Sequence, residues 1–160
     1  MSLLIADFDI PEVMSKTVLE GFEWLDTVND LSIGSTVGVH EEEGSFVSKD
    51  GSLSIAGIAA TNEFGTEDGR IPARPFMSAP FDDNITEFEE EIGDFSKVSS
   101  VPKLNKALAK TAETYRGKVI EGVDNRDYQK NAEYTIKKKG SDMPLRDTGR
   151  LMQSVLTKAI

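Results

Sequence analysis

Two consecutive stretches of apolar residues at helical spacing constrain the fold of this chain more than any other feature. The first stripe recurs at steps of four and three residues and consists of Phe81, Ile85, Phe88, Ile92 and Phe95. It predicts an amphipathic helix over residues 80–96, with the glutamates on the other faces. After a break over residues 97–102, a second stripe predicts another helix, through Leu104, Leu108, Ala112, Tyr115, Val119 and Val123. Two such helices pack their stripes together or onto a sheet.

Shorter elements are predicted on both sides of these helices. A helix capped by Asp9 carries the stripe Met14, Val18, Phe22 and Leu25. Residues 35–40 read as a strand, and residues 44–51 as a hairpin with its turn at 49–51. Residues 54–63 predict a short helix that ends at Gly65, with Gly65 in the left-handed conformation that often follows a helix. A short helix around Tyr134 and Ile136 and a strand over 154–160 complete the pattern.

These elements predict a single α+β domain over residues 1–160. With 160 residues the chain is long enough for one core and too short for two. We expect a small, mainly antiparallel sheet packed with amphipathic helices, including the two long consecutive ones. No apolar run approaches the length of a membrane span, and the first residues have no basic segment typical of a secretory signal, so we expect neither membrane association nor export.

The residue types that most often carry catalysis or bind metals are scarce. The chain has no cysteine and a single histidine, His40, which excludes thiolate chemistry and a typical transition-metal site. The acidic clusters at 41–43, 82–83 and 87–91 match no calcium loop. A chain of net charge -10 also repels a DNA duplex. We therefore expect no enzyme, no metal site, no cofactor and no sequence-specific DNA binding.

The charges are divided unevenly along the chain. Residues 1–100 contain 21 acidic and 5 basic residues, a net charge of -16, whereas residues 101–160 contain 7 acidic and 13 basic residues, a net charge of +6. One interpretation is that each half merely solvates its own surface. The other is that the basic face of one copy contacts the acidic face of the next, which generates a ring when the rotation closes.

The first segment of interest runs from Asn62-Glu63-Phe64-Gly65-Thr66 to Ile71-Pro72-Ala73-Arg74-Pro75-Phe76-Met77. Prolines on both sides of Arg74 restrict its backbone. We expect its guanidinium to pair with a carboxylate, either Glu63 or an acidic group on a neighbouring subunit. Phe64 and Phe76 are predicted to anchor the two ends of the loop in the core.

The second segment is Pro144-Leu145-Arg146-Asp147-Thr148-Gly149-Arg150-Leu151. Asp147 is predicted to cap a helix whose first turn contains Thr148, Gly149 and Arg150, with Leu151 and Val155 on its buried side. Gly149 there suggests the close approach of another backbone. Arg146 takes the place of an apolar staple residue, so we expect it to point outward.

In combination, and in this order, the two segments resemble small tail-completion and neck proteins of tailed bacteriophages. The resemblance covers residues 53–160, about two thirds of the chain, and is less clear for the N-terminal helix and hairpin region, residues 1–52. It departs from the family pattern at Asn62, where the family often has histidine, and at Arg146, where an aliphatic residue is usual. The resemblance implies a non-enzymatic virion protein that forms a ring at the head-tail junction or upper end of the tail, with the genome passing through its centre.

On this basis we expect a structural protein of the virion neck or proximal tail, present in the host cytoplasm during assembly. Its expected partners are itself, as a homohexameric ring, and the neighbouring connector, tail terminator or tail tube proteins. DNA would pass through the lumen without sequence-specific binding. The alternative is an acidic interaction module, such as an assembly scaffold or a DNA-mimicking inhibitor, which would be monomeric or dimeric. The candidate assembly interface comprises Glu63, Arg74, Phe76, Lys137, Lys138, Lys139, Arg146, Asp147 and Arg150.

Overall fold

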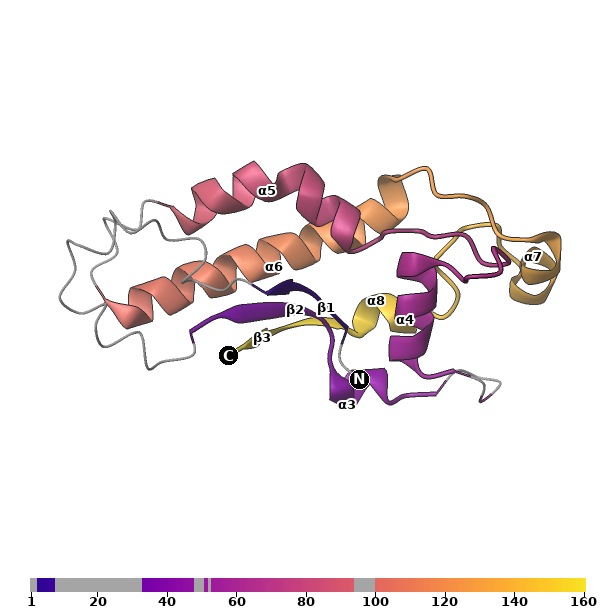
Figure 1. Cartoon of the computed structure of the whole chain (residues 1–160), viewed down its shortest axis with the longest axis horizontal. Coiled ribbons are helices and arrows are strands. Elements are labelled where there is room, and N and C mark those ends of the chain that lie inside the picture. The colour runs from indigo at the N-terminus through magenta and orange to yellow at the C-terminus, as the bar shows by residue number, and fades with distance from the viewer. Residues whose placement is uncertain (1–2, 8–32, 48–50, 52, 94–99) are drawn as a thin grey trace.

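The protein is an elongated α+β domain, as the sequence predicts (Figure 1). The computed structural model describes residues 3–7, 33–47, 51, 53–93 and 100–160. In chain order the elements are β1 (Leu3–Asp7), β2 (Ser35–Val39), α3 (Glu41–Gly44), α4 (Ile55–Phe64), α5 (Ser78–Ile92), α6 (Val101–Asn125), α7 (Glu133–Lys139), α8 (Arg150–Gln153) and β3 (Val155–Ala159). The predicted helix with the stripe Met14 to Leu25 lies outside the described residues.

The sheet has three antiparallel strands in the order β1-β2-β3. The central strand β2 is buried along its whole length, and Val37 and Val39 belong to the hydrophobic core. Its register with β3 pairs Val37 with Thr157 and Val39 with Val155. The predicted strands at 35–40 and 154–160 are therefore confirmed, although Ser154 ends α8 instead of starting the strand.

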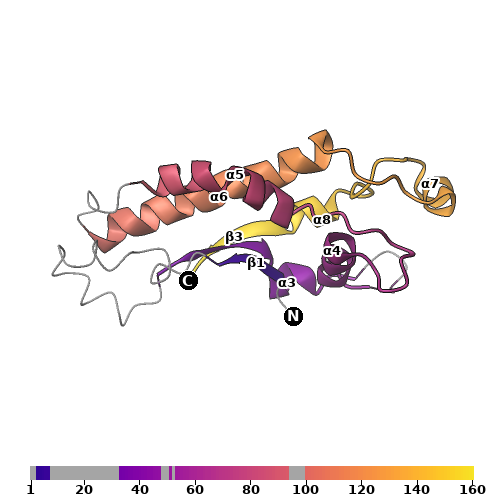
Figure 2. The ribbon, with the colours of Figure 1, turned by 45° about the horizontal axis from the view of Figure 1, so that its top comes forward.

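The two long helices lie on the same side of the sheet (Figure 2), where α6 contacts β2 and β3 and α5 contacts β1. All six residues of the second stripe are buried in α6, which begins at Val101 and carries Pro102 in its first turn. Tyr115 from α6 packs edge-on against both Phe81 and Phe88 of α5, with ring centroids 5.5 and 5.6 Å apart. The two stripes therefore pack together, which is one of the two arrangements that the sequence left open.

The helix α5 differs from its prediction in extent and in one stripe residue. It spans Ser78–Ile92 and ends at Gly93, whose φ of 83° lies outside the helical region, instead of continuing to residue 96. Ile85 is 44% exposed, although the spacing placed it on the buried stripe. The aromatic rings of Phe81 and Phe88 fill the space against Tyr115, which leaves Ile85 at the rim of the contact. Phe95 lies outside the described residues.

The region after β2 is only partly a hairpin. Residues Glu41–Gly44 form one helical turn, α3, in which the amide of Gly44 bonds to the carbonyl of His40. An antiparallel bridge then pairs Val47 with Ser54, which agrees with a hairpin there. Most of its predicted turn lies outside the described residues.

The short helix α4 is confirmed, and its ends follow from local chemistry. The side chain of Ser54 caps its start by accepting a hydrogen bond from the amide of Gly57 at 3.0 Å. Gly65 ends it with φ 74° and ψ -171°, so its φ is positive but the conformation is not the predicted left-handed helical one. A Cβ at this position would lie 2.8 Å from both the nitrogen of Ala73 and the carbonyl oxygen of Ile71. Only glycine lets the two legs of the following loop approach so closely.

Two predictions about the second segment are wrong. Asp147 does not cap α8, because Gly149 holds that position with φ 76°, a value that glycine adopts easily and that is incompatible with a first helical turn. Gly149 also approaches no other backbone, since the nearest neighbour of a Cβ added there would be the side-chain nitrogen of Gln153 at 3.7 Å. Leu151 and Val155 are buried, as expected.

Glu63 supplies the cap that α5 lacks in its own sequence. Met77, at the start of α5, makes no side-chain cap. The carboxylate of Glu63, at the end of α4, accepts hydrogen bonds from the amides of Met77 and Ser78 at 3.0 and 3.1 Å and from the Ser78 hydroxyl at 2.5 Å. A carboxylate at a helix N-terminus satisfies amides that have no partner within the helix and interacts favourably with its dipole. Glu63 is 2% exposed, so this contact joins α4 to α5 inside the protein.

Replacing Glu63 with alanine should therefore destabilise the fold. The substitution leaves the amides of Met77 and Ser78 without their acceptor, and we expect a loss of about 2–3 kcal/mol in the free energy of unfolding. Urea denaturation measures this loss, and Glu89→Ala on the exposed face of α5 is the control. Equal urea midpoints for Glu63→Ala and wild type would contradict the capping role.

Candidate assembly interface

Arg74 lies at the centre of the contacts made by the first segment. Its side chain reaches the turn that follows α6, where Nε donates to the carbonyl of Gln129 at 2.9 Å and Nη2 approaches the carbonyl of Lys130 at 3.4 Å. Nη1 donates to Oδ1 of Asn62 at 3.3 Å. The guanidinium thereby holds together two parts of the chain that lie 55 residues apart in sequence.

Asn131 extends this contact to Asp142 and Met143, the two residues directly before the second segment. Its Oδ1 accepts from Arg74 Nη2 at 3.4 Å, and its Nδ2 donates to the carbonyls of Asp142 and Met143 at 3.3 and 3.2 Å. Residues 131–143, which include α7, are thus closed at their base by one asparagine side chain. Arg74 and Asn131 thus connect the first segment to the residues directly before the second.

The predicted pair between Arg74 and Glu63 is wrong. The carboxylate of Glu63 is occupied by the start of α5, and Arg74 bonds instead to carbonyl and amide oxygens. Arg74 is 4% exposed, and this burial lowers the pKa of its guanidinium from the ordinary value. A buried arginine with fixed oxygen partners stabilises the shape of the loop, so Arg74 and Glu63 are not surface residues of the candidate assembly interface.

The two phenylalanines of the first segment behave differently from each other. Phe76 is fully buried in the core, as predicted. Phe64 was expected to be buried too, but it is 67% exposed. As the last residue of α4 it follows the buried Glu63, so the helical rotation that turns Glu63 inward turns Phe64 outward. An exposed aromatic at this position contributes to a surface, whereas Phe76 contributes only to the core.

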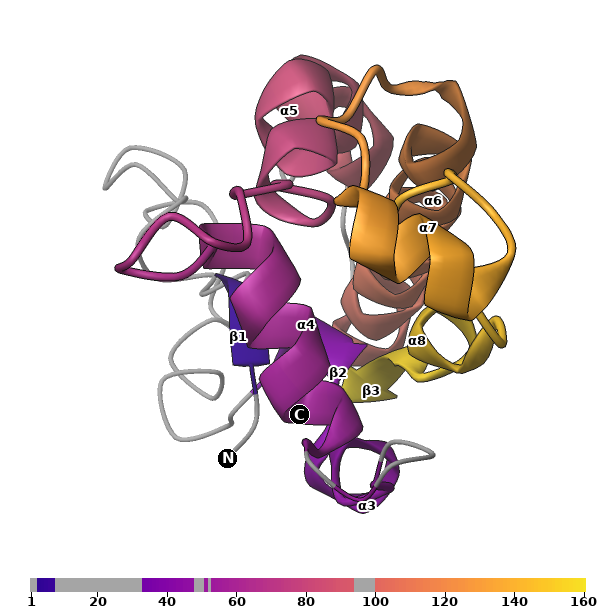
Figure 3. The ribbon, with the colours of Figure 1, turned by 90° about the vertical axis from the view of Figure 1, so that its right-hand side faces the viewer.

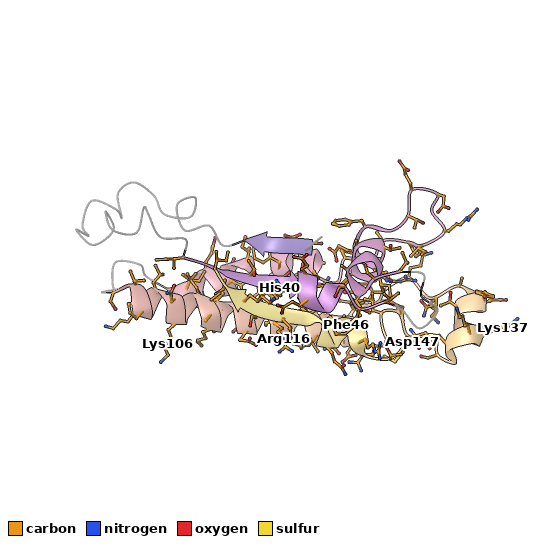
Figure 4. The ribbon with its side chains drawn as sticks, turned by 90° about the horizontal axis from the view of Figure 1, so that it is seen from below. His40, Phe46, Lys106, Arg116, Lys137 and Asp147 are labelled. Atoms are coloured by element: carbon orange, nitrogen blue, oxygen red, sulfur yellow. The ribbon has the colours of Figure 1, made fainter. Side chains whose placement is uncertain are left out.

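The charged residues of the second segment lie on the surface. Arg146 pairs with Asp124 at the end of α6 at 2.6 Å, which agrees with the expectation that it points outward. Arg150 lines a shallow pocket of about 300 Å³ with Phe46, Ile55, Gln153 and Ser154. Asp147 is exposed and lies at the same end of the molecule as Lys137 (Figure 4).

The three lysines at the end of α7 differ in their exposure. Lys137 and Lys138 are exposed, and α7 buries none of its residues. Lys139 is half-buried and donates from Nζ to the carbonyl of Met143. Burial lowers the pKa of Lys139, Asp147 opposes this effect, and the positive charge of Arg74 adds to it. Of the three lysines, Lys137 and Lys138 are the candidates for contact with a partner.

Many of the opposite charges from the two halves of the sequence pair within one chain. Lys110 binds Glu91 at 2.8 Å and Lys118 binds Glu87 at 2.9 Å, and both pairs connect α6 with α5. Arg126 pairs with Asp83, and Lys158 with Glu42 at 3.5 Å. The acidic half and the basic half therefore neutralise each other partly inside the monomer, and fewer charges remain for contacts between copies.

The metal-binding residue types form no cluster in the described part of the chain, and the single histidine is buried. The described residues contain no group of three or more histidine, aspartate or glutamate residues placed to hold a metal ion. His40 is buried, and its Nε2 lies 3.1 Å from the carbonyl oxygen of Leu156, which can accept a hydrogen bond from that nitrogen. Within the same part of the chain, no helix is both long enough and apolar enough to span a membrane.

The exposed apolar residues near Arg74 and α7 were not predicted from the sequence. Phe64, at the end of α4, and Ile71, in the loop after it, are exposed, as are Tyr134 and Met143 in the α7 region. Tyr134 had a signal in the sequence, because its helix is too short and too polar to bury a large aromatic. Ile71 had none, since an apolar residue before a proline is equally consistent with a buried loop end.

Comparison of the chain with protein-family models, curated proteins and solved structures finds no match.

Substitution of Arg74 tests whether its hydrogen bonds stabilise the fold. Arg74→Lys keeps the positive charge but removes the planar fork that reaches several oxygens at once, so we expect a loss of about 3 kcal/mol in the free energy of unfolding. The control is Arg70→Ala, because the Arg70 side chain is 86% exposed and pairs with Asp68 in its own loop. Thermal unfolding at matched buffer measures both. A melting temperature for Arg74→Lys equal to that of Arg70→Ala would exclude a stabilising role for the hydrogen bonds of Arg74.

Proposed function

We propose that this protein is a structural component of a bacteriophage virion, at the head-tail junction or the upper end of the tail. It forms a ring of identical copies, expected to be a hexamer, through which the genome passes. Its neighbours along the tail axis are connector, terminator or tail tube proteins. The basis is the resemblance of residues 53–160 to tail-completion and neck proteins, together with the scarcity of catalytic groups.

The single observation that carries the proposal is the placement of α7. This helix has seven residues, buries none of them, and lies at one end of the long axis of the molecule (Figure 1). Isolated helices of this length are unstable in water. Arg74 and Asn131 fasten the base of this helix, and contact with another subunit would supply the packing that so short a helix lacks along its length.

The acidic face of α5 is consistent with a protein that lets DNA pass without holding it. Asp82, Glu89 and Glu90 are exposed along this helix, together with Asp83 and Glu87, which pair with Arg126 and Lys118 of α6. Like charges disfavour contact with phosphates, so a lumen lined by such a face would have little affinity for the duplex.

The same acidic helix is the specific observation that favours the alternative, an acidic interaction module. A DNA-mimicking inhibitor or an assembly scaffold would present these carboxylates to a basic partner and would remain monomeric or dimeric. Native mass measurement combined with negative-stain imaging of the purified protein separates the two. Closed rings support the neck protein, and a compact monomer or dimer at all concentrations favours the alternative.

Charge reversal on α7 should weaken ring formation. We expect the double variant Lys137→Glu/Lys138→Glu to reduce association by about tenfold or more, because like charges at a contact disfavour it. The control is Lys103→Glu/Lys106→Glu, which changes the net charge equally on α6; Lys106 and Lys137 lie toward opposite ends of the molecule (Figure 4). Sedimentation at moderate salt measures both, and an equal loss in the two variants would show that only net charge matters.

A further inference from the structure

The two most exposed large hydrophobic side chains in the described part of the chain are Tyr134 and Phe64. Tyr134, on α7, is 76% exposed, and Phe64, at the end of α4, is 67% exposed. A second exposed apolar residue lies in each of the two regions. Met143, in the α7 region, is 45% exposed, and Ile71, in the loop after α4, is 36% exposed. Exposed aromatics are enriched at protein-protein interfaces. We call residues 64–71 the loop surface and residues 131–143 the α7 surface.

The loop surface is held in one shape by its own hydrogen bonds. The amide of Thr66 donates to the carbonyl of Ile71 at 2.9 Å, and the amide of Ile71 donates to the Thr66 hydroxyl at 2.9 Å. Asp68 accepts from the amide of Arg70 at 3.0 Å and from the Thr66 hydroxyl at 2.8 Å, and these bonds lower the pKa of its carboxyl group. A loop ordered before binding loses little conformational freedom when a partner docks.

The α7 surface is ordered in a comparable way. Gly140 ends α7 in the left-handed conformation, with φ 75° and ψ 11°. Lys139 and Asn131 hold the carbonyl of Met143, and the amide of Met143 donates to the Ser141 hydroxyl at 3.1 Å. Tyr134 is thus displayed on a small closed unit that is built independently of the main core.

The two surfaces lie on opposite sides of the same end of the molecule. Seen along the long axis, the loop between α4 and α5 projects to one side and α7 to the other (Figure 3). Surfaces in this arrangement cannot meet within one chain, but they meet when copies stand side by side about an axis parallel to the long axis. That contact is heterologous, the type that produces a ring when it closes.

The charges of the two surfaces have opposite signs. The loop surface carries Glu67 and Asp68 against Arg70, a net charge of -1. The α7 surface carries Lys137, Lys138 and Lys139 against Glu133 and Asp142, a net charge of +1. Pairing like surfaces would place equal charges together, whereas pairing unlike surfaces brings opposite charges together around an apolar centre.

We propose that the loop surface of one copy docks against the α7 surface of the next copy, with Phe64 and Ile71 packing against Tyr134 and Met143. The partner is therefore a second copy of this chain. This inference rests on the proposed ring and specifies which two surfaces form its subunit contact. Arg74 lies three residues past the loop surface and bonds to Asn62, which precedes that surface, and to Asn131 at the base of the α7 surface.

The absence of native cysteine allows a direct test by disulfide cross-linking. The double variant Ile71→Cys/Tyr134→Cys should give, under oxidation, a ladder of dimers, trimers and higher species that a reductant abolishes. Neither single variant should give more than background. The matched control is Ile85→Cys/Tyr134→Cys, because Ile85 is also an exposed isoleucine, 44% exposed, but lies on α5.

The outcomes separate this inference from the proposed function. Rings in native mass spectra without a ladder would overturn the docking of these two surfaces and leave the ring intact. Dimers from either single variant would indicate contact between like surfaces and would also overturn the inference. A chain that stays monomeric at every concentration, with no ladder, would overturn both.

A second measurement uses substitutions at exposed positions. Phe64→Ser and Tyr134→Ser should each weaken association by about tenfold or more, as expected for aromatic residues at the centre of an interface. Phe46→Ser, at another exposed aromatic of 60% exposure, should leave association unchanged. Equal association constants for all three variants would overturn the proposal, and thermal unfolding verifies that each variant is folded.

Discussion

The buried guanidinium of Arg74 is the contact on which the arrangement of this end of the molecule depends. It bonds to Asn62, Gln129 and Asn131, so α4, the turn after α6 and the base of the α7 region share one group. Such a charge is costly to bury, and the fixed oxygens around it offset that cost only while all of them are in place. The geometry of three segments is consequently coupled: a change at any of them alters the environment of the same side chain.

Glu63, which follows Asn62 on α4, also connects two segments of the chain. Helix α5 begins after a proline-rich stretch that offers no capping side chain of its own, and the carboxylate of Glu63 satisfies its first amides from another helix. Arg74 and Glu63 therefore stabilise the two ends of the same stretch, residues 74–78, through separate partners. Arg74 and Glu63 are thus two buried charges that do not pair with each other. Each fixes the position of the chain between α4 and α5 through its own hydrogen bonds.

The sequence allowed much of the architecture to be predicted, because periodicity reports burial directly. The stripe from Leu104 to Val123 is buried without exception, and the strand at 35–40 follows from its residue types. The partners of charged groups could not be predicted in this way. Arg74 and Glu63 are close in sequence, but their partners come from residues 129–131 and 77–78, and only the folded chain brings those within reach. Phe64 was misplaced for a related reason, since loop anchors and exposed contact residues have the same composition.

The distribution of ion pairs changes how the divided charge of the sequence is interpreted. A net charge of -16 in one part and +6 in the other suggests strong attraction between copies. However, Lys110, Lys118 and Arg126 already pair with carboxylates of α5 within the same chain. The charges that the proposed contact would use lie on α7 and on the loop after α4. An interface of that kind depends chiefly on its apolar centre, and its charges select the partner surface more than they determine the affinity. Salt should then slow the encounter of subunits more than it weakens an assembled ring.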